Sequence, residues 1–361
     1  MVEAGRRKAV ENHRGRPPSM ADVAALAGVS AQTVSRVVNG SRNVDPETQD
    51  RVERAMRMIN YQPNSAARAL ATGRNKMIGI ISFDLEAYGN ARALQAIVAR
   101  AQSHDYSVDV VTVKHSNEGD IAKAFQRLRR QNVDGIIVNQ AQVLDSFLSL
   151  PTGVPVVVVD GDIEHRYRGV QTDHAAGSAI AVRHLLDLGH ETVWHLAGPN
   201  LSIPARRRAE AWLAALNDAD RPVPQVLYGD WTAASGYEVG REMARIPEMT
   251  AVFAANDQMA LGLMRALHEA GRSVPGDVSI VGFDNIPESG YFLPPLTTID
   301  QDFEAIGRES VELLMAQLAG TDTPEARGVT TITPRIVVRS STTRRARPPS
   351  DASPRGSAPR S

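Results

Sequence analysis

Short apolar runs rich in β-branched residues alternate with amphipathic stretches from Met77 onward. The runs include MIGIISF, VDVVTV, VPVVVVD, AVFAAND and VSIVGFD, with helical periodicity between them, for example through Ala93–Ser103 and Ala205–Asn217. Nearly continuous apolar runs are typical of strands buried on both faces, and their alternation with helices indicates parallel sheets. About 260 residues suffice for two such sheets. The pattern therefore predicts an α/β body of two lobes, with a ligand cleft outside the carboxyl ends of the strands.

Polar or aromatic residues follow several of these runs where each predicted strand ends. They are Phe83-Asp84, Asn139, Asp160, Asn256-Asp257 and Phe283-Asp284. Because the carboxyl ends of parallel strands meet at one edge, we expect these side chains to line the cleft. Carboxylates and amides bind hydroxyl groups, and a flat ring such as that of Trp231 covers one face of a sugar. These residue types together suit a small sugar.

Residues 19–62 have a different pattern, that of three short helices. Ser19 opens the first helix as a capping residue, Gly28 ends it, and Ser30 is a suitable N-cap for the second. In the second helix, VSAQTVSRVVNG, valines form a buried stripe and polar side chains lie on the outer face. Two helices joined by a tight turn, the second with a polar outer face, predict an all-α helix-turn-helix that reads a DNA major groove.

The distribution of charge agrees with this division. The chain has a net charge of −1, but residues 1–76 hold 13 Lys and Arg against 7 Asp and Glu. Residues 77–339 hold 22 against 33, so a basic head precedes an acidic body. A basic head is suited to a polyanion such as DNA, although a solvated basic tail would give the same balance.

The connecting and terminal segments are polar or short. Residues 1–18 and 340–361 are expected to be disordered. The Arg14–Pro17 segment, RGRP, fits either an arginine arm in a minor groove or an inert arm. Residues 63–75 are alanine-rich and hold a helix of about two turns, too short to be stable alone in water. We predict a hinge helix there that orders against a partner.

Several functional classes are disfavoured by the sequence. It holds no cysteine, no Gly-x-Ser-x-Gly elbow and no Walker A loop. We interpret His184, His190 and His195 as unrelated structural histidines, and Asp160-Gly161-Asp162 as a strand-end group instead of a metal site. No secretory signal or membrane-spanning run is recognised. The expected protein is therefore cytoplasmic and non-enzymatic, without metal or cofactor; an enzyme and a sugar-binding receptor with no DNA role remain the alternatives.

An ordered series of segments resembles the LacI/GalR family of bacterial transcription repressors. The segments are VSAQTVSRVVN, RVERAMRMINYQPN, HLLDLGH, LAGP, GDWTAASG, AANDQMALGLMRAL, DVSIVGFD and PPLTTIDQDF. A set in this order is far more specific than a helix-turn-helix match alone. The resemblance implies a helix-turn-helix head on a two-lobed α/β core of the periplasmic-binding-protein type, with two parallel sheets. The expected core spans residues 76–339, with an N-lobe over about 76–172 and 303–330 and a C-lobe over about 173–299 and 331–339.

The resemblance also implies roles for individual residues. Gln32 and Arg36 match the family's readers of the major groove, with Ala31 beside them, and Leu70 matches the hinge leucine that wedges into the minor groove. The residues that match the family's backbone-positioning contacts are Ser30, Thr33, Ser35 and Asn39. Asn64 is also expected to contact DNA. The expected effector-pocket set is Phe83, Asp84, Asn139, Asp160, Arg208, Trp231, Asn256, Asp284 and Phe303.

Two departures from the family pattern affect the expected function. The C-terminal segment RSSTTRRARPPSDASPRGSAPRS has no leucine heptad of the kind that joins dimers of some members into tetramers, so we expect a homodimer. Ala31 is small where relatives carry larger side chains, which leaves its base preference open. The expected function is a repressor of a palindromic operator, released by a galactoside or another glycoside. A ligand that acts as corepressor or activator is the alternative.

Overall fold

The computed structural model describes residues 18–38, 44–62, 73–83, 85, 87–113, 118–139, 153–161, 167–321 and 328–345. The chain divides into two compact units, Met1–Asn75 and Lys76–Ser361. The predicted hinge, apart from residues 73–75, and the predicted N-terminal arm, apart from Pro18, lie outside the described residues.

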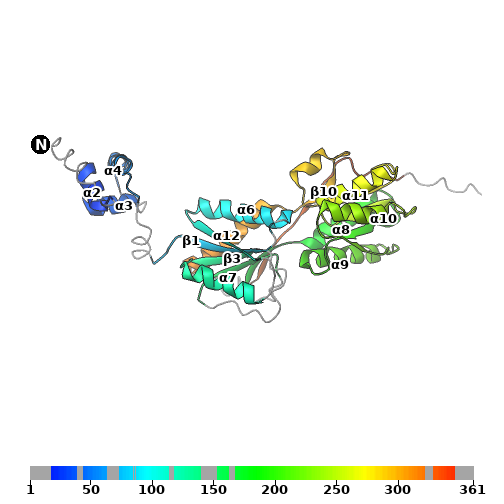
Figure 1. Cartoon of the computed structure of the whole chain (residues 1–361), viewed down its shortest axis with the longest axis horizontal. Coiled ribbons are helices and arrows are strands. Elements are labelled where there is room, and N and C mark those ends of the chain that lie inside the picture. The colour runs from blue at the N-terminus through cyan, green and yellow to red at the C-terminus, as the bar shows by residue number, and fades with distance from the viewer. Residues whose placement is uncertain are drawn as a thin grey trace, which may run out of the picture. The chain divides into compact units, whose positions relative to one another are not determined.

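The first unit contains the three predicted helices, α2 (Met20–Ala27), α3 (Ala31–Val38) and α4 (Pro46–Met58) (Figure 1). Gly28 ends α2 with a left-handed backbone, at a φ of 66° that suits glycine. One fully buried valine from each helix, Val23, Val34 and Val52, contributes to a common core. This packing fixes which face of α3 points outward.

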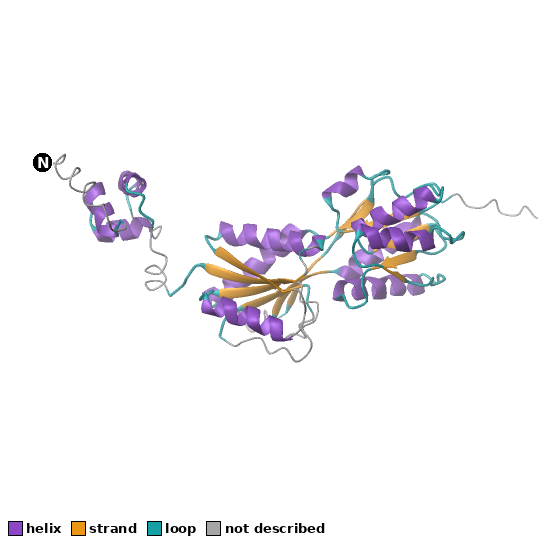
Figure 2. Ribbon diagram, viewed as in Figure 1, coloured by secondary structure: helices purple, strands orange, loops and turns teal. Residues whose placement is uncertain are grey.

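The first lobe of the second unit is a six-stranded parallel sheet of order β11-β5-β4-β3-β1-β2. Helix α7 (Glu118–Arg130) packs on one face, while α6 (Tyr88–Ser103) and α12 (Phe303–Ala319) cover the other (Figure 2). The strands are β1 (Met77–Phe83), β2 (Ser107–Val113), β3 (Gly135–Asn139), β4 (Val156–Val159), β5 (Arg168–Thr172) and β11 (Val329–Ile332).

The second lobe is another six-stranded sheet, of order β12-β10-β9-β8-β6-β7. Its strands are β6 (Trp194–Ala197), β7 (Leu227–Tyr228), β8 (Ala251–Ala254), β9 (Ser279–Phe283), β10 (Thr297–Asp300) and β12 (Arg335–Val337). Its helices are α8 (His174–Asp187), α9 (Ile203–Asp218), α10 (Ala233–Met243), α11 (Asp257–Glu269) and the 3-10 helix η1 (Pro287–Tyr291). The expectation of two parallel sheets needs one correction, because β12 runs antiparallel to β10. An antiparallel edge strand can be connected without a crossover helix. The strand–helix alternation that predicts parallel sheets therefore gives no information about β12.

The chain passes between the lobes after β5, β10 and β11. After β11 the chain leaves the first lobe two residues later than the expected boundary at about residue 330. The reason is that Thr331 and Ile332 still pair with β5 in the first sheet. Helix α6 also begins at Tyr88, five residues before the expected start at Ala93. Its first turn, YGNA, has no apolar periodicity that could have predicted it.

Residues 340–345 correct the prediction of a disordered tail from residue 340. Ser341 is fully buried; its hydroxyl donates to the Ile280 carbonyl at 2.6 Å and accepts from the Thr297 amide at 2.8 Å. Thr343 and Arg345 continue these contacts, and the Arg345 amide donates to Leu188. A polar segment is ordered here because strand ends of the second lobe offer free backbone partners. Residues 346–361 lie outside the described residues.

Candidate functional site

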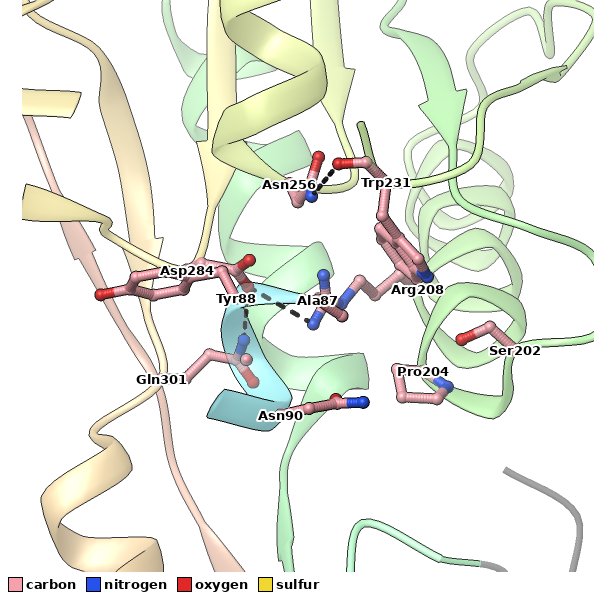
Figure 3. A pocket seen from close by; sticks show the side chains of 11 residues that line it. Ala87, Tyr88, Asn90, Ser202, Pro204, Arg208, Trp231, Asn256, Asp284 and Gln301 are labelled. Carbon is pink, nitrogen blue, oxygen red and sulfur yellow. Dashed lines mark hydrogen bonds and ion pairs between the residues drawn. The ribbon is translucent and has the colours of Figure 1, made fainter. Parts of the chain in front are cut away.

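A pocket lies where the two lobes face each other, at the carboxyl ends of their strands (Figure 3). It encloses about 420 Å³ of empty space, part of it open to solvent. The first lobe contributes Ala87, Tyr88, Gly89 and Asn90, all at the start of α6. The second lobe contributes Ser202, Pro204, Arg208, Trp231, Asn256 and Asp284, and Gln301 follows β10. A ligand in this pocket would contact both lobes.

Arg208 is the central cation of the pocket. It stands on α9, is only 4% exposed, and its guanidinium carbon lies 3.7 Å from the centroid of the Phe283 ring and 5.5 Å from that of Trp231. Its Nη2 is 3.7 Å from the Asp284 carboxylate, and Nη1 donates to the Ala255 carbonyl. Burial lowers the pKa of Arg208, but arginine stays charged at neutral pH. The cation is thus fixed by aromatic faces and one carboxylate.

Asp284 lies beside Arg208 in the pocket wall and is also buried. Burial raises the pKa of its carboxyl to about 6, against the opposing effects of Arg208 and of the Gln301 hydrogen bond. The Gln301 amide donates to Asp284 Oδ1 at 2.5 Å. The Gln301 Oε1 atom is buried and has no hydrogen-bond partner among the described residues. The pocket therefore offers acceptor oxygens to hydroxyl donors of a ligand.

A buried polar chain continues from Arg208 to the first lobe. Arg208 Nε donates to His174 Nδ1 at 3.4 Å, and His174 Nε2 lies 3.5 Å from Asp160 Oδ1. The same Asp160 oxygen accepts the Thr172 amide at 2.7 Å. Burial lowers the pKa of His174, so its ring is neutral. Asp160 therefore stands behind the pocket and is not part of its wall.

Trp231 and Asn256 are linked on the second lobe. Trp231 has a φ of 78°, a left-handed backbone that is strained for a bulky residue. The Asn256 amide donates to the Trp231 carbonyl at 2.9 Å, while its oxygen caps α11 by accepting the Met259 amide. In Figure 3 the indole extends from this anchor toward Arg208. Asn256 thus lines the pocket and holds the strained turn.

Tyr88 carries the first lobe's aromatic surface. Its ring meets Phe303 edge-on, with centroids 6.1 Å apart, and it packs against apolar clusters of both lobes. Burial raises the pKa of its hydroxyl. Tyr88 therefore connects the pocket to both cores.

The structure brings together four of the nine expected pocket residues: Arg208, Trp231, Asn256 and Asp284. Four others lie behind the wall and not in it. Phe83 packs in the first-lobe core, Phe303 lies behind Tyr88, Asp160 binds Thr172, and Asn139 donates to Ser82 and to the Asn90 carbonyl. Asp84 lies outside the described residues.

Sequence reasoning missed Tyr88, Asn90, Ser202, Pro204 and Gln301, all of which line the pocket. Ser202 caps α9, and Pro204 lies in the first turn of that helix. The helix start that follows a strand end is the sequence signal that could have identified both residues. Gln301 directly follows the last residue of β10, which is the same signal as the strand-end residues gave.

The three singled-out histidines have separate partners. The His195 ring stacks on the rings of Trp212 and Phe253. His184 forms a hydrogen bond with the Thr342 hydroxyl, and His190 forms one with the Thr250 hydroxyl. Within the described ranges, no cluster of three or more His, Cys, Asp or Glu side chains suits a metal ion. No described helix is both long and apolar enough to cross a membrane.

The outer face of α3 is the candidate DNA-reading surface. Ala31, Gln32 and Arg36 are exposed. Ser30 caps the helix, since its hydroxyl accepts the Thr33 amide at 3.1 Å and lies 2.9 Å from the Thr33 hydroxyl. Ser35 is partly buried on the next turn, and Asn39, Asn64 and Leu70 lie outside the described residues. Gln32 and Arg36 are four residues apart, so they share one face of the helix.

Two family descriptions match the chain. Residues 19–64 match "Bacterial regulatory proteins, lacI family", and residues 182–342 match "Periplasmic binding protein-like domain". The lactose operon repressor of Escherichia coli (strain K12) is 37% identical over 307 residues, covering 83% of this chain and 84% of that protein. The chain belongs to the lacI family. The transcriptional repressor PurR of Pasteurella multocida (strain Pm70) is 35% identical, with coverage of 89% and 97%.

Solved structures of transcriptional regulators share the fold. The lac repressor dimer bound to operator and the anti-inducer ONPF has a TM-score of 0.77 at 35% identity, covering 91% of this chain and all of that one. A complex of the transcriptional regulator CelR with cellobiose has a TM-score of 0.65 at 30% identity, covering 90% and 99%. The protein is accordingly a DNA-binding transcription repressor with an effector-binding core.

Proposed function

We propose that this repressor binds a palindromic operator as a homodimer and releases it when a small sugar, a galactoside or another glycoside, enters the interlobe pocket. The observation that carries the proposal is the pocket itself, in which Arg208, Asp284 and Trp231 of one lobe face Tyr88 of the other. Charged and amide groups bind sugar hydroxyls, and the aromatic rings cover the apolar faces of a sugar ring. The solved structures described with operator and ONPF, with ONPG and with cellobiose support the same chemistry.

The head reads DNA through α3. Gln32 and Arg36 supply side chains that match base edges in the major groove, and Ser30, Thr33 and Ser35 position the helix on the backbone. Ala31 adds a small apolar contact next to Gln32. We retain Asn39 as a backbone contact, Asn64 as a DNA contact and Leu70 as the minor-groove wedge of the hinge, on the strength of the family resemblance alone.

Exposed apolar side chains on the second lobe provide a surface for the dimer. Tyr291 and Leu293 are 87% and 93% exposed, and Leu261 on α11 is 42% exposed. Such side chains in water favour association with a second copy. The lac repressor structure is described as a dimer. A homodimer places two α3 helices on the two half-sites of a palindrome.

The ligand controls the repressor by binding two lobe arrangements with different affinities. Only that difference shifts the population between the DNA-binding and released states. The proposed protein is cytoplasmic and needs no catalysis, cofactor or metal for this action.

The test is operator binding with and without sugars. Operators selected by the repressor from a random library should be palindromic, and fluorescence anisotropy should show their release by at least one galactoside or glycoside. Equal binding to scrambled and selected sequences would refute the DNA assignment. A sugar that tightens operator binding would instead establish the corepressor alternative.

A further inference from the structure

The residue directly after β6, Gly198, lies against the indole ring of Trp231. A Cβ atom built on Gly198 would stand 2.6 Å from both Cζ2 and Cζ3 of that ring, and closer still to Cη2. Real side chains do not approach so closely, so any other residue at this position requires a displacement. Gly198 has no left-handed backbone that would itself demand glycine. The requirement for glycine comes from the indole.

Neither backbone can easily withdraw from this contact. The Ala197 carbonyl, just before Gly198, accepts the Gly229 amide at 2.8 Å, and the Ser202 amide donates to the Pro199 carbonyl at 2.9 Å. On the other side, the Trp231 carbonyl is held by Asn256 at 2.9 Å. An added methyl group would therefore be accommodated mainly by rotation of the Trp231 side chain.

Rotation of the indole would alter the pocket wall. The ring lines the pocket and stands over the Arg208 guanidinium, 5.5 Å from centroid to Cζ. We infer that Gly198 is a positioning residue of the effector pocket, where the absence of a side chain lets the Trp231 indole lie at the angle that stacks on the effector. This inference rests on the proposed function for the stacking partner, but the ring position itself can be tested without any effector.

The first experiment observes the ring in the effector-free protein. The chain has three tryptophans, so labelling with 5-fluorotryptophan gives three ¹⁹F resonances, assigned by single Trp→Phe variants. Gly198→Ala should shift the Trp231 resonance and leave that of buried Trp212 in place. Gly328→Ala is the matched control, because its Cβ would meet nothing within 4 Å. An unmoved Trp231 resonance in folded Gly198→Ala protein would overturn the inference.

The second experiment is a double-mutant cycle on sugar binding. Gly198→Ala should weaken binding about tenfold, since displacement forfeits much of an aromatic stacking contact. In a Trp231→Leu background the same change should alter affinity by less than about twofold, because the colliding ring is gone. Equal losses in both backgrounds would mean that Gly198 does not act through Trp231, which overturns the inference. If no sugar binds the wild type, the proposed function fails, and the ¹⁹F experiment still decides the role of Gly198.

Discussion

Replacing Asp284 by asparagine should stabilise the repressor while abolishing its response to sugar. Burial raises the pKa of the Asp284 carboxyl from its ordinary value of 3.8 to about 6. A raised pKa means that the folded state prefers the protonated carboxyl, so its stabilising contribution is complete below pH 3.8 and is lost as the pH rises to 6. Above pH 6 the ionised carboxylate therefore destabilises the fold by about 3 kcal/mol.

Asparagine has nearly the shape of the protonated carboxyl and cannot ionise. Asp284→Asn should therefore gain about 3 kcal/mol at pH 7.5, about 1.5 kcal/mol at pH 5 and under about 0.5 kcal/mol below pH 4. Arg208 lacks a charged partner in the variant and equally in the wild type when Asp284 is protonated. The missing ion pair therefore does not contribute to the difference in stability between these two proteins. This gain in stability is possible because a residue kept for ligand binding need not be the one that gives the most stable fold.

Urea unfolding at the three pH values, with sugar titrations at pH 7.5, measures both halves of this prediction. The control is Asp300→Asn, which removes a carboxylate that is paired with exposed Arg335 and does not line the pocket. Loss of stability in Asp284→Asn at pH 7.5, or a gain that does not vary with pH, would refute the reasoning. Retained sugar response would remove the carboxylate from the binding chemistry.

Three further predictions concern the head, the pocket and the second-lobe core. Arg36→Ala should lose roughly 1–3 kcal/mol of preference for operator over scrambled DNA in anisotropy titrations, with sugar binding retained; an equal loss on both DNAs would make Arg36 only a phosphate contact. Trp231→Ala should leave operator affinity intact and shift the sugar titration at least tenfold; an unchanged titration would remove Trp231 from the pocket. Burial lowers the pKa of fully buried His195 to about 4, so its contribution to stability is present above pH 6.5 and is lost as the pH falls toward 4. His195→Asn should lose about 2 kcal/mol less unfolding free energy than the wild type between pH 7 and pH 5 in urea unfolding, and a variant with the wild-type pH slope would contradict this assignment.

The fold was predictable because each level of the sequence pattern agreed with the next. The MIGIISF and VSIVGFD runs became central strands, since only sheets covered on both faces bury such continuous apolar segments. In the head, Gly28 and the valine stripe determined where the turn falls and which face of α3 is exposed. The antiparallel β12 and the ordered segment 340–345 were not predictable, because both depend on backbone partners that only the folded second lobe provides.

The pocket was predictable only in part, since its wall depends on how the lobes pack. Position at a strand end marked Asp284 and Asn256, which both line the pocket. The same signal also marked Asp160, whose carboxylate instead turns back to the Thr172 amide, with a φ of 46°. Tyr88 was missed because the first turn of α6 has no apolar periodicity. The contact between Gly198 and Trp231 joins residues 33 positions apart and leaves no local signal.

The proposed function requires that the interlobe pocket and the DNA-binding head are energetically coupled, and reciprocity of binding tests that coupling most directly. The dissociation constant of the inducing sugar is measured by calorimetry with the repressor free and then saturated with operator. Linkage requires operator to weaken sugar binding by the same factor as sugar weakens operator binding. We predict equal factors, at least about fivefold in each direction. A sugar affinity unchanged by bound operator would contradict the account, because the pocket would then be unconnected to DNA recognition.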